Sequence, residues 1–244
     1  MVNQMHVATN ASNPLPPLGE RPLPTLIALL PCMLVLEYVL MLGGDGSTAH
    51  RVLAHERIGE TLHFFGLSPV FVLHGTTILV TVVLLMWQWL SAAPWKLTFR
   101  EPLQLWFEGI IATAPLLAGA AFLGSLHSTP LTTPALESGS VLDSMAVAIG
   151  AGLSEEFLFR MVGILAVHAL LADLCRLPSA AATIIAVVLT AAAFTWYHDP
   201  ASMPGSTVAF IAAAGLYLGA LYVLRGFAVA VLAHIGYDLV VLIG

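Results

Sequence analysis

Ionisable residues stand inside three long apolar stretches of the sequence, where burial makes them costly. They are Glu155, Glu156 and Arg160 in SEEFLFR, His198 in FTWYHDP, and His234 and Asp238 in AHIGYDL. A charge at the centre of a membrane-spanning helix costs about 2.5 to 3.5 kcal/mol on insertion scales. Each of these residues is therefore a candidate for function.

The spacing of the first group separates one carboxylate from its neighbours. On an α-helix Glu156 and Arg160 lie one turn apart on the same face and can neutralise each other. Glu155 is adjacent to Glu156 and so points about 100° away. This leaves Glu155 without a built-in partner, in the kind of tunable environment that a general base needs.

The two other groups also follow helical spacing. Phe194 and His198 share a face one turn apart, and Pro200 stops the helix just beyond them. His198 alone has an equally good interpretation as a capping residue at a helix C-terminus. His234 and Asp238 lie one turn apart as well, and as an isolated pair they could form a structural hydrogen bond.

Together the three groups indicate hydrolytic chemistry of one of two kinds. Carboxylates and imidazoles could coordinate a divalent metal such as zinc, although the sequence has no His-Glu-x-x-His motif. The same groups suit metal-free hydrolysis, in which a carboxylate and an imidazole polarise one water against an amide. The second histidine and the aspartate would then hold the oxyanion. Ser154 lacks the flanking glycines of a nucleophile elbow, so the sequence does not favour a serine protease.

The composition requires that membrane helices position these groups. Of the 244 residues 59% are hydrophobic and only 9% are charged, whereas soluble domains carry roughly a quarter charged residues. We therefore predict an all-α fold, a polytopic transmembrane helix bundle of about seven spans. The expected spans are 23–42, 69–90, 102–126, 141–174, 179–197, 206–224 and 226–243.

Three regions are predicted along the chain. Residues 1–22 form a polar tail. Residues 23–140 hold three accessory spans and a polar loop near 43–68, interpreted as a short helix on the membrane surface. Residues 141–244 form a four-helix core, in which abundant alanine and glycine let helices approach closely.

The basic residues predict the orientation of the bundle. With the tail in the cytoplasm, the positive-inside rule is satisfied, and the chemical groups fall in the outer half of the bundle. The residues then inside are Arg21, Lys96, Arg100, Arg176 and Arg225, against Arg51 and Arg57 outside. The net charge of −6 excludes a nucleic acid partner, so the expected partners are the bilayer and a membrane-anchored protein or peptide.

Other notable residues are expected to be structural. Cys32 and Cys175 are too far apart in sequence for a Cys-x-x-Cys site and are interpreted as inert packing residues. Four ionisable residues stand alone on apolar helices: Glu37, His74, Glu108 and His168.

The motifs E-E-x-x-x-R, F-x-x-x-H and H-x-x-x-N/D, in this order on successive helices, resemble the CAAX-protease and bacteriocin-processing (CPBP) family. These proteins are glutamic-type intramembrane endopeptidases, and the resemblance covers about residues 141–244. It implies that Glu155 activates water and that His198 assists as base and later proton donor. Glu156 and Arg160 look like the supporting ion pair, with Phe194 beside them.

His234 and Asp238 match the oxyanion-stabilising pair of the family. Here the chain departs from members with asparagine, because an ionised aspartate cannot donate a hydrogen bond. We expect Asp238 to orient His234 as an imidazolium donor instead. The resemblance implies hydrolysis without a cofactor, with a divalent metal such as zinc as the alternative.

The resemblance also implies a class of substrate and a location. Eukaryotic relatives trim prenylated C-terminal tripeptides at the cytoplasmic face, whereas bacterial members resemble processors of C-terminal anchoring signals or act in bacteriocin maturation. An outward site favours exported substrates and a multi-pass protein of the bacterial inner membrane. Two alternatives remain: a proton-coupled transporter, in which Pro115 and Gly119 could break the third span, and a non-catalytic scaffold or immunity protein.

Overall fold

The computed structural model describes residues 17–42, 69–91, 93–125 and 141–243, and these residues form helices and no strand. The all-α prediction is thus confirmed. Most of the polar tail, the polar loop near 43–68 for which a surface helix was predicted, and residues 126–140 lie outside the described residues.

The membrane-spanning helices have nearly the predicted bounds. They are α1 (Pro22–Leu42), α4 (Pro69–Leu90), α5 (Arg100–Ser125), α6 (Val141–Glu155), α7 (Leu165–Ala169), α8 (Ser179–Tyr197), α9 (Gly205–Arg225) and α10 (Phe227–Ile243). Two π-helical segments, η2 (Glu156–Ile164) and η3 (Leu170–Leu174), join α6 and α7 into one helix from Val141 to Leu174. Within the described ranges, five helices are long and apolar enough to cross a membrane, and shorter apolar helices at His74–Leu90 and Phe227–Ile243 account for the other two predicted spans.

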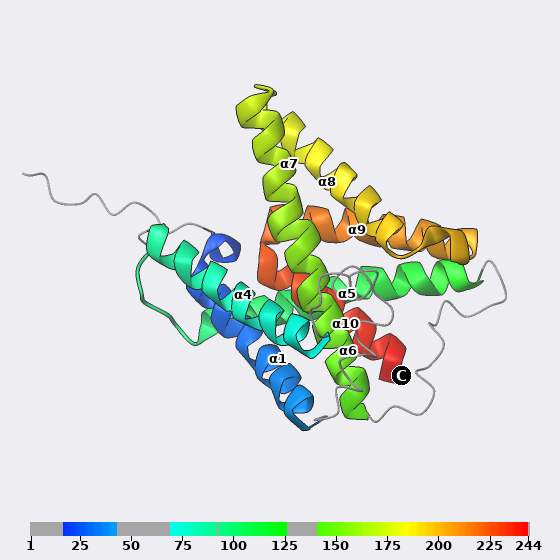
Figure 1. The fold of residues 1–244 in the computed structure, drawn as a ribbon, viewed down its shortest axis with the longest axis horizontal. Helices are drawn as coiled ribbons and strands as arrows, with labels where there is room; N and C mark the ends of the chain where they lie inside the picture. The colour runs from blue at the N-terminus through cyan, green and yellow to red at the C-terminus, as the bar shows by residue number, and fades with distance from the viewer. Residues whose placement is uncertain (1–16, 43–68, 92, 126–140, 244) are drawn as a thin grey trace, which may run out of the picture.

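α10 is the central helix of the bundle (Figure 1). It packs against α5, α6 and α9, and its residues Phe227–Ile235 are buried without interruption. A helix that is apolar on all sides belongs in such a position. One apolar core joins residues of α1, α4 and α5 to those of α6 and α10.

α5 runs through Pro115 as a single helix. Proline in a membrane helix is tolerated because neighbouring helices satisfy the backbone groups that it frees. Near the proline, Tyr217 of α9 donates a hydrogen bond to the carbonyl oxygen of Ala112 at 2.9 Å, which ties α5 to α9 at this turn. The third span is thus not broken at this point.

Candidate active site

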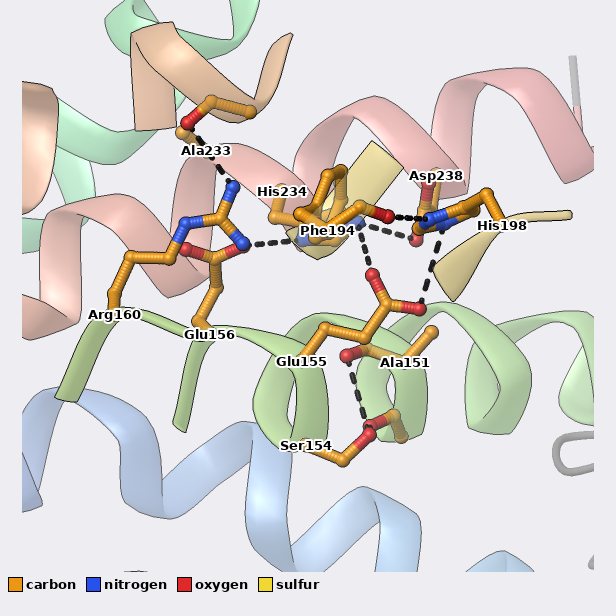
Figure 2. Close-up of polar contacts among 12 residues, drawn as sticks. Ala151, Ser154, Glu155, Glu156, Arg160, Phe194, His198, Ala233, His234 and Asp238 are labelled. Atoms are coloured by element: carbon orange, nitrogen blue, oxygen red, sulfur yellow. Dashed lines mark hydrogen bonds and ion pairs between the residues drawn. The ribbon is translucent and has the colours of Figure 1, made fainter. Parts of the chain in front are cut away.

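Three elements bring the predicted groups together. Glu155 ends α6 and Glu156 begins the π-helical segment η2, His198 lies directly after α8, and His234 and Asp238 lie on α10. Figure 2 shows their side chains pointing toward one another across the space between these helices. The site is assembled from the three motifs, as the sequence predicts.

The π-helical segment begins next to Glu155, which the sequence did not reveal. The prediction placed both glutamates on a regular α-helix, but the i→i+5 bonding of a π-helix widens the turn after Glu155. Such segments occur often at functional sites. No residue type in SEEFLFR marks the change, because all of these residues are accepted in an α-helix.

Glu156 is the buried anchor of the site. Its Oε1 atom lies 3.0 Å from Nη1 of Arg160 and accepts a 2.8 Å hydrogen bond from Nδ1 of His234. The side chains of Glu156 and Arg160 are 0% and 1% exposed. Buried charges of this kind persist only when they are paired, because the desolvation of each ion costs several kcal/mol, on the order of the attraction between them.

Arg160 is held by two further contacts. Its Nη2 atom donates to the carbonyl oxygen of Gly215 on α9, at 3.3 Å. Its guanidinium carbon lies 4.3 Å from the centre of the Phe194 ring, in cation–π geometry. The Gly215 carbonyl belongs to the site, and sequence reasoning missed it because a backbone acceptor has no residue signature.

His198 is held in one tautomer by the end of α8. Its Nδ1 atom lies 2.8 Å from the carbonyl oxygen of Phe194, which can only accept, so Nδ1 carries the hydrogen. In the neutral ring Nε2 is then the acceptor. That atom faces Oε1 of Glu155 at 3.8 Å.

Glu155 lies between the two imidazoles. Its residue is 4% exposed, and its Oε2 atom lies 3.8 Å from Nε2 of His234, the same distance that separates Oε1 from His198. Both distances are too long for a direct hydrogen bond. A polar contact of this length can be completed by a bridging water molecule, so Glu155 and His198 are placed to bind the same water.

Asp238 completes the far side of His234. Its Oδ2 atom lies 3.5 Å from Nε2 of His234, while Nδ1 of the same ring is committed to Glu156. His234 is therefore flanked by carboxylates on both ring nitrogens. Its side chain is 9% exposed, whereas those of Asp238 and His198 are 20% and 24% exposed, so the site opens on the side of these two residues.

Aromatic rings pack around the two histidines. Phe194 contacts the ring of His198 with centroids 4.5 Å apart, and Phe159 packs edge-on against both Phe194 and Tyr197. These rings are buried, so they exclude water from the Arg160 side of the site.

The other singled-out residues lie elsewhere, and most have structural partners. His74 pairs with Glu37 between α4 and α1, Arg225 pairs with Glu108 between α9 and α5, and His168 lies 3.2 Å from Oγ of Ser179. The Ser154 hydroxyl donates to the carbonyl of Gly150. Cys32 is buried as expected, but Cys175 is exposed at the end of the long helix, which corrects its interpretation as a packing residue.

A divalent metal is the alternative that the sequence leaves open for these residues. Among the described residues no three His, Cys, Asp or Glu side chains are grouped so that they could hold a metal ion. One nitrogen of His234 is bonded to Glu156 and one of His198 to a carbonyl. Metal-free hydrolysis is therefore a proposal, because a histidine that binds a metal also donates its other ring nitrogen in this way.

Comparison with known proteins gave one match. Residues 137–240, which contain all three motifs, match the family model described as type II CAAX prenyl endopeptidase Rce1-like. The searches of curated proteins and of solved structures found no match. The family match confirms the resemblance predicted from the motifs and indicates a multi-pass membrane endopeptidase of the CAAX type.

Proposed function

Because residues 137–240 match this endopeptidase family, we propose that the protein hydrolyses a peptide bond of a membrane-anchored substrate with a water activated by Glu155 and His198. The observation that carries the proposal is the 3.8 Å separation between Oε1 of Glu155 and Nε2 of His198, two acceptors that face each other. Neither atom has a direct partner across this gap, and one water can donate to both.

The proposed reaction needs only the groups of the chain. Glu155 takes a proton from the water while the water oxygen attacks the carbonyl carbon of the substrate. The negative charge that develops on the carbonyl oxygen is stabilised by Nε2–H of the His234 imidazolium. Glu155 passes this proton to His198, which delivers it to the amide nitrogen as the C–N bond breaks. The products leave as a carboxylic acid and an amine, and the proton of the acid passes to the amine.

Asp238 and Glu156 support His234 in this scheme. Glu156 accepts from Nδ1, which fixes the ring, and Asp238 stabilises the cationic form near Nε2. An ionised Asp238 cannot bind the oxyanion itself. We therefore propose that Asp238 acts through His234, as an orienting carboxylate.

We further propose that the substrates are exported proteins of a bacterial inner membrane, cut near a C-terminal anchoring signal. The support is the charge pattern. Arg21 pairs with Glu101 and donates to the carbonyl of Lys96, and Gly19 packs on the carbonyl of Arg225, so these basic residues gather at one end of the bundle. α10 begins at this end with Phe227, and Asp238 lies about 16 Å further along the helix, at about 1.5 Å per residue.

The test is cleavage of a tail-anchored reporter substrate in membranes by wild type, Glu155→Gln and His198→Ala, each with and without a chelator. Matched controls are Glu108→Gln and His168→Ala, which change the same residue types outside the site. The proposal expects loss of cleavage in the two site variants only, and no effect of the chelator. Cleavage by Glu155→Gln at the wild-type rate would reject it in favour of the transporter.

A further inference from the structure

α10 carries His234 and Asp238 of the site and packs closely between α5 and α6 at glycine residues. On the α6 side, a Cβ at Gly152 would lie 2.6 Å from Cγ1 of Ile235. On the α5 side, a Cβ at Gly109 would lie 2.5 Å from Cβ of Leu232. Both distances are shorter than van der Waals contact, so the three helices are as close as their glycines allow.

The closest of these contacts lies between His234 and Asp238. A Cβ at Gly236 would lie 2.4 Å from Oγ1 of Thr113 and 3.4 Å from its Cγ2. The Thr113 hydroxyl also donates to the carbonyl oxygens of Gly109, at 3.1 Å, and of Ala233, at 3.4 Å. Thr113 thus contacts the backbone of α10 on both sides of His234.

We infer that Thr113 and Gly236 are positioning residues of the active site, and that α5, which lies outside the family match, sets the place of His234 and Asp238 against Glu155. The inference rests on the proposed function. Gly109 and Thr113 lie four residues apart, as do Leu232 and Gly236, so α5 and α10 run parallel over a full turn in this contact. A shift of α10 at this turn moves both functional side chains.

The required precision follows from the distances. Any side chain at Gly236 must move about 1 Å from Thr113 to reach ordinary van der Waals separation. A displacement of about 1 Å in an active site can lower the rate about 100-fold. The Glu155–His234 separation of 3.8 Å involves the same helix, so it changes when α10 shifts.

The experiment is a double-mutant cycle at Gly236 and Thr113, measured on the protein in membranes. Gly236→Ala is expected to lower kcat about 100-fold with KM within about threefold, because the substrate still binds while His234 is misplaced. Thr113→Ala removes Oγ1 and Cγ2 and leaves its Cβ 3.5 Å from the new methyl. The double variant should therefore recover to within about threefold of Thr113→Ala alone.

The matched control is Gly75→Ala on α4, where a Cβ meets nothing within 4 Å. It should keep wild-type kcat, since alanine favours a helix over glycine. If Gly236→Ala does not fold, Thr113→Ile presses on the same contact from α5 and should lower kcat in the same direction. Unchanged kcat in both crowded variants, or a double variant no better than Gly236→Ala, would overturn the inference.

Failure of the proposed function is distinguishable in the same assay. If Glu155→Gln also cleaves normally, the catalytic assignment is wrong, whatever Gly236→Ala does. If Glu155→Gln is inactive while Gly236→Ala is normal, the site stands and the positioning role of α5 is wrong.

Discussion

At the scale of single residues, the site depends on which atoms are already committed. Oε1 of Glu156 contacts both Arg160 and His234, and Nδ1 of His198 is bonded to a backbone carbonyl. What remains uncommitted is the carboxylate of Glu155 and Nε2 of His198. The sequence could separate the two glutamates by their spacing to Arg160, since an i,i+4 pair is a local property.

Breaking the Glu156–Arg160 pair should destabilise the fold. Glu156→Gln or Arg160→Met leaves one buried charge without its partner, which lowers the free energy of unfolding by about 3 to 5 kcal/mol. The double variant buries no charge at either of these two positions and should be more stable than either single variant. Thermal unfolding in detergent ranks the stability of the three variants. A double variant less stable than both single variants would contradict the account.

Substitutions at Asp238 should separate an orienting from a donating role. In Asp238→Asn the amide can itself donate to the oxyanion, so cleavage should stay within about tenfold of wild type. Asp238→Leu offers neither function and should lower kcat about 100- to 1,000-fold, the cost of losing an oxyanion donor. Equal losses of kcat in the two variants would show that an amide cannot replace the carboxylate at this position.

At the scale of elements, the helix ends position His198. The backbone N–H of His198 bonds to Thr195 rather than to Phe194, which leaves the Phe194 carbonyl for the imidazole. Asp199 then takes a left-handed conformation with φ of 52°, and Pro200 prevents the helix from continuing.

Replacing Pro200, which ends α8, should change the orientation of the His198 imidazole. In Pro200→Ala α8 can continue, the backbone N–H of His198 takes the Phe194 carbonyl, and Nδ1 loses its acceptor. We expect kcat to fall about tenfold, a part of what a positioned base contributes. Pro178→Ala at the other end of α8 is the control. An unchanged pH–rate profile and kcat in Pro200→Ala would show that the carbonyl does not fix the ring.

The helices could be predicted from sequence far better than their contacts. Apolar runs bounded by Pro and Gly gave α8 as residues 179–197, because length and hydropathy determine a membrane span. The π-helical segment, the Gly215 carbonyl and the Thr113–Gly236 contact could not be predicted. They depend on how helices distant in sequence pack, and no local pattern in a single chain encodes that packing.

At the scale of the whole molecule, two sets of ion pairs lie at different levels of the bundle. Arg21–Glu101 and Arg225–Glu108 lie at the end where α1, α5 and α10 begin, and the site lies beyond the middle of α10. In the orientation that we propose from the positive-inside rule, the first set lies in the cytoplasm. The opening beside Asp238 and His198 is then expected to face the outer side.

The native cysteines offer a direct check of orientation. Cys175 is exposed next to Arg176, and Cys32 is buried. A membrane-impermeant maleimide should label Cys175 only after the membrane is permeabilised. In a Cys175→Ser background, Ala201→Cys in the segment after His198 should be labelled in intact cells. The opposite pattern would place the site in the cytoplasm and exclude exported substrates.

The central claim is that Glu155 and His198 act on one water, and a double-mutant cycle tests it most directly. The measurement is kcat/KM for cleavage by Glu155→Gln, His198→Ala and the double variant. Groups that act as a unit are strongly non-additive, so the double variant should be no more than about threefold slower than the slower single variant. Losses that multiply would show that the two residues act independently, and would contradict the account.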